Sequence, residues 1–263
     1  MRHYGRTELF QKGKIKTFLN SLVDQKMQTK FELIIKASKV TVLFTILIIN
    51  GTNALAQKWW NTIEDIRLVT EMASCKSWEI LKQDNEVTLR SRWLTFGDSL
   101  KTREISSHFV VDADIQSVLV HLILPEKVMV WNYGIKSMKL LKHEGYTWIT
   151  HSVYDIPYPF SQQDLVVKNI LIKENQKVII LLSALPDYIA PLSNVNRQRL
   201  YFGKWELNPL DNGTTEVSFS AISFSNSGIP RIIRDPIIQN KLFHSFSLLK
   251  ELSSETKPFA KRM

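Results

Sequence analysis

Residues 197–224, which read RQRLYFGKWELNPLDNGTTEVSFSAISF, decide the fold. The stretch predicts two strands, Arg197–Leu207 and Thr215–Phe224, joined by a turn at Asp211-Asn212-Gly213. Asn-Gly between two apolar stretches is the strongest short-range hairpin signal, because these residues tolerate the positive φ angles of tight turns. The stretch therefore predicts a pair of adjacent antiparallel strands.

The region before this hairpin has the same strand-and-turn pattern. Its turns are of hairpin length, and consecutive strands with short turns pair antiparallel. Four further strands are predicted, at Met138–Lys142, Tyr146–Ile156, Asp164–Lys173 and Lys177–Leu185.

A long helix is predicted to follow the hairpin. Asp235 is a suitable N-cap, and Pro236 suits the first helical position. Apolar residues then recur at spacings of 4, 4 and 3, at Ile238, Leu242, Phe246 and Leu249. A curved antiparallel sheet closing around this helix would bury its apolar face, and such an arrangement often leaves a cavity for an apolar ligand.

The preceding part of the chain mixes helices and strands. Helices are predicted at Trp59–Cys75 and Ile115–Leu124, the second capped by Asp112 or Asp114 and ended by Pro125. Strands are predicted at Ser77–Lys82, Glu86–Thr95 and Thr102–Val111. Residues 57–263 thus form one α+β domain.

The first 56 residues have the pattern of a leader. Lys36 and Lys39 precede the apolar run Val40–Ile49, and Ala54-Leu55-Ala56 follows it. A positive region, a short apolar region and a small-x-small end are the parts of a secretory signal peptide. We therefore expect cleavage after Ala56 and export to the periplasm or the medium. The alternatives are an uncleaved leader that keeps the protein at a membrane, or a buried core strand.

The apolar run begins too far along the chain for an ordinary signal peptide. A start at Met27 gives a leader of 30 residues, 27–56, which is within the usual range. Residues 1–26 are then interpreted as an upstream mis-start.

The charge does not indicate a nucleic-acid partner. The formal net charge is +9, but residues 1–56 hold 9 Lys/Arg and 3 Asp/Glu, a net of +6. The remaining 25 basic and 22 acidic residues give +3 and form no long run of like charge. A mixed-charge solvated surface is the simpler interpretation, and no nucleic-acid partner is expected.

Several segments, taken in chain order, resemble START domains. Ile156-Pro157-Tyr158-Pro159-Phe160-Ser161-Gln162-Gln163-Asp164 resembles that family's Pro-Trp-Pro segment followed by Arg-Asp. Arg197 then stands eight residues before Trp205. Lys204–Pro209 resembles the family's Trp strand, and Gly228-Ile229-Pro230 its entry to the C-terminal helix. The matches span residues 78–252.

The resemblance implies a helix-grip fold, with a curved antiparallel sheet wrapped around the C-terminal helix and an internal cavity. It also implies a non-catalytic carrier or sensor of lipids, with no metal and no cofactor, and transient contact with a membrane surface. Three positions depart from the family. Gln163 replaces Arg, Tyr158 replaces Trp, and Ser225–Gly228 replaces an Asp-Pro-Gly-Gly turn, which alters the loop beside the entry to the C-terminal helix, the gate that the resemblance implies.

Two groups of residues are candidates for the ligand site. The resemblance singles out Arg197 and Asp164 as a polar contact for a headgroup or hydroxyl. The alternative is a structural salt bridge or turn anchor, since a buried charge needs a partner. The apolar candidates are Trp148, Trp205, Phe219, Ile238, Leu242 and Phe246, for which plain core packing is the alternative.

No established catalytic motif is present in the sequence. The six His residues have no metal-ligand spacing, and no phosphate loop or nucleophile elbow occurs. Cys75, the sole cysteine, is interpreted as a small buried hydrophobe. His151 and Asp155 lie four residues apart on a predicted strand and are the one candidate acid–base pair. A hydrogen-bonded or surface pair is the alternative.

The sequence therefore favours a non-catalytic protein that holds a lipid or other small hydrophobic molecule. One alternative is an enzyme of the START superfamily, cyclase- or hydrolase-like, acting on a hydrophobic substrate. A second is an interaction module whose cavity is filled by its own side chains.

Overall fold

The computed structural model describes residues 65–97, 100–158, 160–224 and 230–255. The chain divides into two compact units, 1–56 and 57–263, and every described residue belongs to the second unit. The predicted signal peptide and the start at Met27 lie outside the described residues. They remain predictions.

Within the described residues, eleven strands form one sheet. The first five are β1 (Ser74–Cys75), β2 (Glu79–Gln83), β3 (Val87–Phe96), β4 (Leu100–Val111) and β5 (Ile135–Glu144). The others are β6 (Thr147–Tyr154), β7 (Gln162–Glu174), β8 (Lys177–Ala184), β9 (Val195–Arg197), β10 (Tyr201–Pro209) and β11 (Thr215–Ser223). The order is β1-β3-β4-β11-β10-β8-β7-β6-β5, with β2 on β3 and β9 on β7. The pairing is antiparallel except for β9, which runs parallel to β7.

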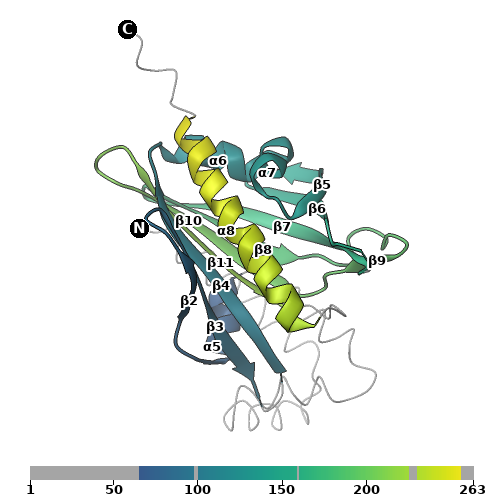
Figure 1. Ribbon diagram of the computed structural model, residues 1–263. Helices are drawn as coiled ribbons and strands as arrows, with labels where there is room; N and C mark the ends of the chain where they lie inside the picture. The colour runs from purple at the N-terminus through teal and green to yellow at the C-terminus, as the bar shows by residue number, and fades with distance from the viewer. Residues whose placement is uncertain (1–64, 98–99, 159, 225–229, 256–263) are drawn as a thin grey trace, which may run out of the picture. The chain divides into compact units, whose positions relative to one another are not determined.

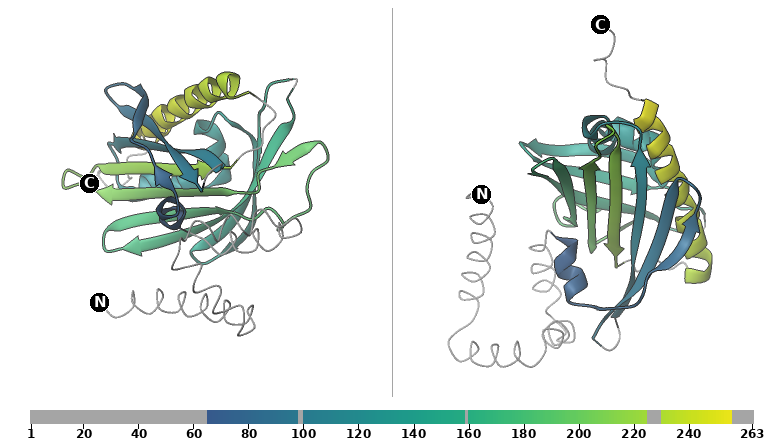
Figure 2. Two further views of the ribbon diagram at one scale, coloured as in Figure 1. Left: turned by 90° about the horizontal axis from the view of Figure 1, so that it is seen from below. Right: turned by 90° about the vertical axis from the view of Figure 1, so that its left-hand side faces the viewer.

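Four helices accompany the sheet in the described part of the chain. They are α5 (Ile66–Glu71), α6 (Ile115–Ile123), α7 (Pro125–Trp131) and the long α8 (Arg231–Glu255). The sheet is strongly bent, and α8 crosses it on the concave side, with α6 and α7 at one end (Figures 1 and 2). This is the predicted helix-grip arrangement, in which the curved sheet and the C-terminal helix enclose a space.

The hairpin predicted from residues 197–224 is confirmed. β10 and β11 pair antiparallel, with Trp205 opposite Phe219. Gly213 in the turn has a φ of 80°, which a residue with a Cβ rarely adopts. Because side chains alternate between the faces of a strand, Trp205 and Phe219 both point to the concave side.

The core lies between the concave face and the helices. Phe109, Val217 and Leu207 from the sheet, Val118 from α6 and Leu249 from α8 are all almost fully buried in one cluster. A ring of α8, Phe246, lies 6.1 Å from Phe109 and 5.4 Å from Phe219, measured between ring centroids. The apolar face predicted for the C-terminal helix is therefore what attaches it to the sheet.

The short helix after β4 was predicted correctly, and its end lies within one residue of the prediction. Asp114 is the N-cap, and its carboxylate accepts a hydrogen bond of 2.9 Å from the Ser117 amide. Pro125 follows the end of α6 as predicted, and it also begins a second helix that was not predicted. It stands at the first position of α7, where its missing N–H has no intrahelical partner to lose.

The C-terminal helix begins earlier than its sequence pattern suggests. α8 starts at Arg231, so Asp235 is not the N-cap and Pro236 lies inside the helix. Pro236 removes one backbone hydrogen bond, to the carbonyl of Ile232. Ile232 is 84% exposed, so water can satisfy that carbonyl in place of the lost donor.

Two smaller expectations at the edges of the sheet were wrong, and one short strand was missed. The helix predicted over Trp59–Cys75 is helical only at Ile66–Glu71 among its described residues, and Ser74–Cys75 is an edge strand. Cys75 is exposed rather than buried. The short parallel strand β9 has no periodic signal, because three residues are too few to show one.

Candidate functional site

The space between the concave face and α8 contains a cavity of about 540 Å³. That volume is within the range of roughly 300–1,000 Å³ typical of small-molecule sites. It corresponds to about 18 water molecules at ~30 Å³ each. The cavity is therefore far larger than a packing defect, and the alternative of a space filled by the protein's own side chains does not hold.

One wall of the cavity is formed by α8. Ile238, Leu242 and Phe246 line it, at successive spacings of four residues that keep them on one helix face. Leu249, the next residue of that face, is fully buried in the core instead. The helix thus changes from core to cavity wall along its length.

The inner end of the cavity is closed by aromatic rings. The Trp205 ring centroid lies 4.5 Å from that of Phe219 and 5.9 Å from that of Phe246. Trp131 of α7 packs edge-on against Trp205 at 6.0 Å. The Trp131 indole N–H donates a 2.8 Å hydrogen bond to the carbonyl oxygen of His121, which fixes the ring's orientation. Further apolar lining comes from Leu122, Val128, Ile135, Met138, Leu165, Val167, Leu182 and Ala221.

The other end is marked by lining residues that are also exposed to solvent, and we call it the mouth. These residues are Lys101, Asp155, Pro157, Ser223, Ile237 and Ile238. Charged groups gather here. Asp235 lies 3.7 Å from the Arg103 guanidinium and 3.2 Å from that of Arg234, and the Lys241 ammonium donates to the Asp155 carbonyl at 3.0 Å. The mouth is polar, while the interior is mainly apolar.

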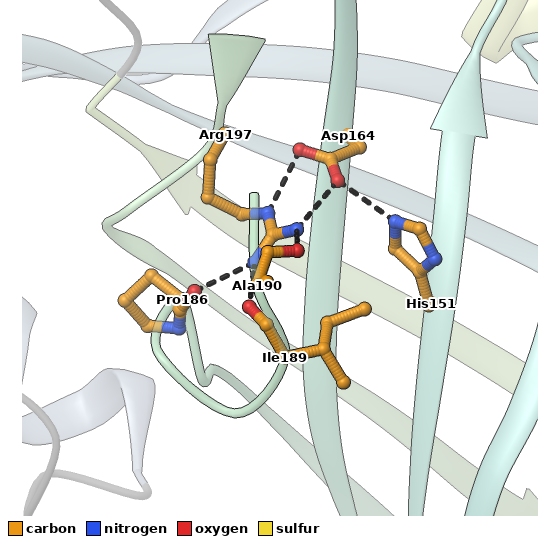
Figure 3. Close-up of polar contacts among 6 residues, drawn as sticks. All are labelled: His151, Asp164, Pro186, Ile189, Ala190 and Arg197. Atoms are coloured by element: carbon orange, nitrogen blue, oxygen red, sulfur yellow. Dashed lines mark hydrogen bonds and ion pairs between the residues drawn. The ribbon is translucent and has the colours of Figure 1, made fainter. Parts of the chain in front are cut away.

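Asp164 and Arg197 form a buried ion pair on the opposite side of the sheet. Their Cα atoms are partners between β7 and β9. The Arg197 guanidinium binds both Asp164 carboxylate oxygens at 2.8 Å (Figure 3). Asp164 is 0% exposed, and the Arg197 side chain is 4% exposed.

The same guanidinium holds the connection between β8 and β9. Its remaining donors reach the carbonyl oxygens of Pro186, Ile189 and Ala190 at 2.6, 3.2 and 3.4 Å (Figure 3). All five N–H donors of Arg197 therefore have an acceptor. A chain segment without regular structure is fixed to the sheet in this way.

His151 completes the cluster. Its Nε2 lies 2.8 Å from an Asp164 carboxylate oxygen (Figure 3). Burial of Asp164 raises the pKa of its carboxyl group, but hydrogen bonds from Arg197 and His151 and the charge of Arg197 outweigh that effect. The net result is a pKa below the ordinary value. Asp164 is therefore a stable anion that serves as a structural anchor.

Metal-binding clusters are absent from the part of the chain that the structure describes. In the same residues, no helix has the length and apolarity needed to cross a bilayer.

No model of a known protein family matches the sequence. One curated relative, an uncharacterised protein of Pseudomonas aeruginosa, is 33% identical over 101 residues. The match covers 38% of this chain and 50% of the relative, so the chain spans half of that protein's length.

Solved structures resemble this one much more broadly. A STAR-related lipid transfer protein of Xanthomonas axonopodis superposes with a TM-score of 0.60 at 19% identity, covering 68% of this chain and 99% of that one. Human StAR-related lipid transfer protein 5 superposes with a TM-score of 0.57 at 12% identity, covering 77% of this chain and 96% of that one. Human STARD10 superposes with a TM-score of 0.59 at 10% identity, covering 73% of this chain and 78% of that one. The fold is the START-like helix-grip fold.

The START-like fold brings five of the eight predicted site residues to the cavity: Trp205, Phe219, Ile238, Leu242 and Phe246. Trp148 does not reach it. Trp148 is on the same face of β6 as the lining residue Thr150, but it stands two residues before Thr150, where its side chain is packed in the core.

Asp164 and Arg197 are likewise not brought to the cavity, in contrast to the prediction. Gln163 and Leu165 line the cavity, so Asp164 between them points to the other face of β7. The geometry matches the alternative interpretation, a salt bridge that anchors a loop. The proposed pair of His151 and Asp155 is also separated, because Asp155 lines the mouth while His151 binds Asp164.

Lining residues from β6, β7 and α7 were not predicted from the sequence. Thr150, Ser152 and Tyr154 alternate along a predicted strand, so their common face was predictable. Which face is concave was not, because both faces of this strand are covered by other parts of the chain. Trp131 lies in a helix that had not been predicted.

Proposed function

We propose that this START-like domain binds a lipid or another small hydrophobic molecule in its cavity, as a non-catalytic carrier or sensor. One observation supports this most directly: a cavity of about 540 Å³ whose wall is mainly apolar and whose mouth reaches solvent. Binding an apolar ligand there is favoured by roughly 25 cal/mol for each Å² of apolar surface that is removed from water. The likeness in fold to StAR-related lipid transfer proteins points in the same direction.

The non-catalytic assignment rests on the placement of the one candidate acid–base pair. His151 is turned away from the cavity and is bound to Asp164, so it does not share a reaction site with Asp155. A superfamily enzyme is the alternative function. Turnover of a bound molecule that is lost in Asp155→Asn would establish it and overturn the carrier assignment.

The proposed function is tested by native mass spectrometry of the purified full chain, followed by extraction and identification of any co-purified molecule. We expect an added mass that organic extraction removes. A neutral fluorescent probe such as Nile red should then bind the extracted protein. Failure of both observations would refute ligand binding. Leu242→Asp is the matched variant, because it places a charge on the cavity wall and should abolish probe binding.

We also propose that the chain is exported after cleavage following Ala56. The support is the order of basic residues, apolar run and small-x-small end in residues 36–56.

A further inference from the structure

One wall of the cavity carries a set of polar side chains that the proposed function does not yet use. Thr150, Ser152 and Tyr154 occupy alternate positions of β6 and all line the cavity, together with Asn169 of β7 and Tyr201 of β10. We call these five residues the polar strip. Thr150, Ser152 and Asn169 are 3–6% exposed, so the strip is built into the interior of the domain.

Much of the hydrogen-bonding capacity of the strip is unused. Within the described residues, the hydroxyl groups of Ser152, Tyr154 and Tyr201 have no hydrogen-bond partner, and the Asn169 side-chain carbonyl accepts no bond. The Asn169 amide nitrogen has only long contacts, all of 3.3 Å, to the Trp148 and Val167 carbonyl oxygens and the Thr150 hydroxyl. Because these groups line the cavity, cavity water or the polar atoms of a bound molecule can be their hydrogen-bond partners.

The strip contains no charged residue. Charged lining residues are instead at or near the mouth, on β4, after β6 and on the first half of α8: Lys101, Arg103, Asp155, Arg234, Asp235 and Lys241. Burial raises the pKa of Tyr154 to about 12 and also raises that of Tyr201, so both phenols remain protonated at neutral pH. An ionised ligand group beside the strip would therefore lose its hydration without gaining an opposite charge.

We propose that the ligand is an apolar molecule carrying neutral oxygen functions, such as hydroxyl, ketone or ester groups, that hydrogen-bond to the polar strip. A pure hydrocarbon would displace the water from these groups without replacing its hydrogen bonds, which lowers affinity. Alternate residues of a strand are roughly 6.8 Å apart. Two oxygens separated by about 7 or 14 Å can therefore reach two members of β6 at once. The inference rests on the proposed function and specifies its ligand class.

The test compares four probes with the same ten-carbon chain: decane, 1-decanol, 2-decanone and decanoate. Each competes with Nile red for the extracted full-length protein, and the inhibition constant is measured. We expect 1-decanol and 2-decanone to bind at least tenfold more tightly than decanoate. The informative variants are Ser152→Ala and Tyr154→Phe, which remove one hydroxyl each and leave the chain packing nearly unchanged.

In each variant, the affinity for 1-decanol relative to decane should fall by roughly 2- to 12-fold, as for the loss of one hydrogen bond. Ser220→Ala and Tyr188→Phe are matched controls that should leave the ratio unchanged. Ser220 is on the other face of β11, between the lining residues Phe219 and Ala221, and Tyr188 is exposed in the β8–β9 connection. Circular dichroism establishes that each variant is folded.

Three results would overturn the inference. Decanoate binding best, with a strong dependence on salt, would mean that cations at the mouth hold an ionised headgroup. Unchanged alcohol-to-alkane ratios in both strip variants would mean that the strip does not recognise the ligand. In both cases the domain would still be a hydrophobic carrier or sensor. Failure of Nile red itself to bind would instead remove the proposed function, and this inference with it.

Discussion

Replacing Arg197 with Met is expected to destabilise the domain strongly without changing the affinity of the cavity for a ligand. The Asp164 carboxylate is 0% exposed in the native structure, and among the described residues His151 is the side-chain partner that would remain. It also removes the donors to the three carbonyls of the β8–β9 connection. The substitution should therefore destabilise both the buried ion pair and the β8–β9 connection that Arg197 holds.

The expected magnitude follows from the burial of the pair. Breaking a buried ion pair from one side costs about 3–5 kcal/mol, because an uncompensated charge is left inside the protein. For a domain of 150–250 residues, 1 kcal/mol corresponds to about 2–4 °C in Tm. Arg197→Met should therefore lower the Tm by about 6–20 °C.

Arg199→Met is the matched control. Arg199 is two residues further along, and its ion pair with Asp187 at 3.0 Å is exposed on both sides. Exposed pairs contribute only about 0–1 kcal/mol, so the control should melt within a few degrees of the parent protein. The double variant Asp164→Leu with Arg197→Met should be less destabilised than the sum of its single changes, since it buries no unpaired charge.

The assays are thermal unfolding by circular dichroism and titration with Nile red at a temperature where each variant is folded. The result that would refute the reasoning is a normal Tm for Arg197→Met together with a lost or much weakened affinity. Arg197 would then contact the ligand, and the described ion pair would not be its main role.

Three further outcomes are expected. The pKa of Asp164 is depressed in the folded state, so its ionised carboxylate stabilises the fold fully above the unfolded pKa of about 3.9, and this stabilisation is lost as the pH falls through the folded pKa. Urea unfolding between about pH 6 and pH 2 should show the loss. The Asp164→Asn variant should show a smaller dependence of stability on pH over the same range. Phe246→Ala should lower the free energy of unfolding by about 3–5 kcal/mol, because the ring is 1% exposed, whereas Leu242→Ala should lower it by less, because Leu242 is half-buried. Both variants should bind Nile red more weakly, because both residues line the cavity. Equal losses of stability with unchanged affinity would contradict the assignment of these residues to the cavity wall. N-terminal sequencing of the exported protein should begin at Gln57, and an intact leader on a soluble protein would refute cleavage.

The regular elements of the domain could be predicted from local patterns. The β10–β11 hairpin follows from Asn212-Gly213, and the apolar face of α8 from the spacing of Leu242 and Phe246. Both signals act over a few residues, within one turn or one helix repeat, so they survive without knowledge of the rest of the chain. The overall architecture was predicted from the resemblance to START domains, whose matching segments follow the same order along the chain.

The boundaries were less predictable, because capping and proline signals fit more than one place. Pro125 suits the end of one helix and the beginning of the next, and in the structure it follows the end of α6 and begins α7. Asp235-Pro236 resembles a helix start, yet the helix begins at Arg231 and Asp235 lies near Arg103 instead.

The sequence by itself determined that residues 57–263 contain an antiparallel sheet followed by an amphipathic helix. It also identified five residues of the cavity wall, namely Trp205, Phe219, Ile238, Leu242 and Phe246, but not the larger remainder of that wall. Only the tertiary structure decided which face of each strand is the inside. Asp164 and Leu165 are adjacent in β7, yet the first anchors a loop on one side of the sheet and the second lines the cavity on the other. The physical reason is that strand alternation fixes which residues share a face, whereas the curvature of the whole sheet and the position of α8 determine which face encloses the cavity.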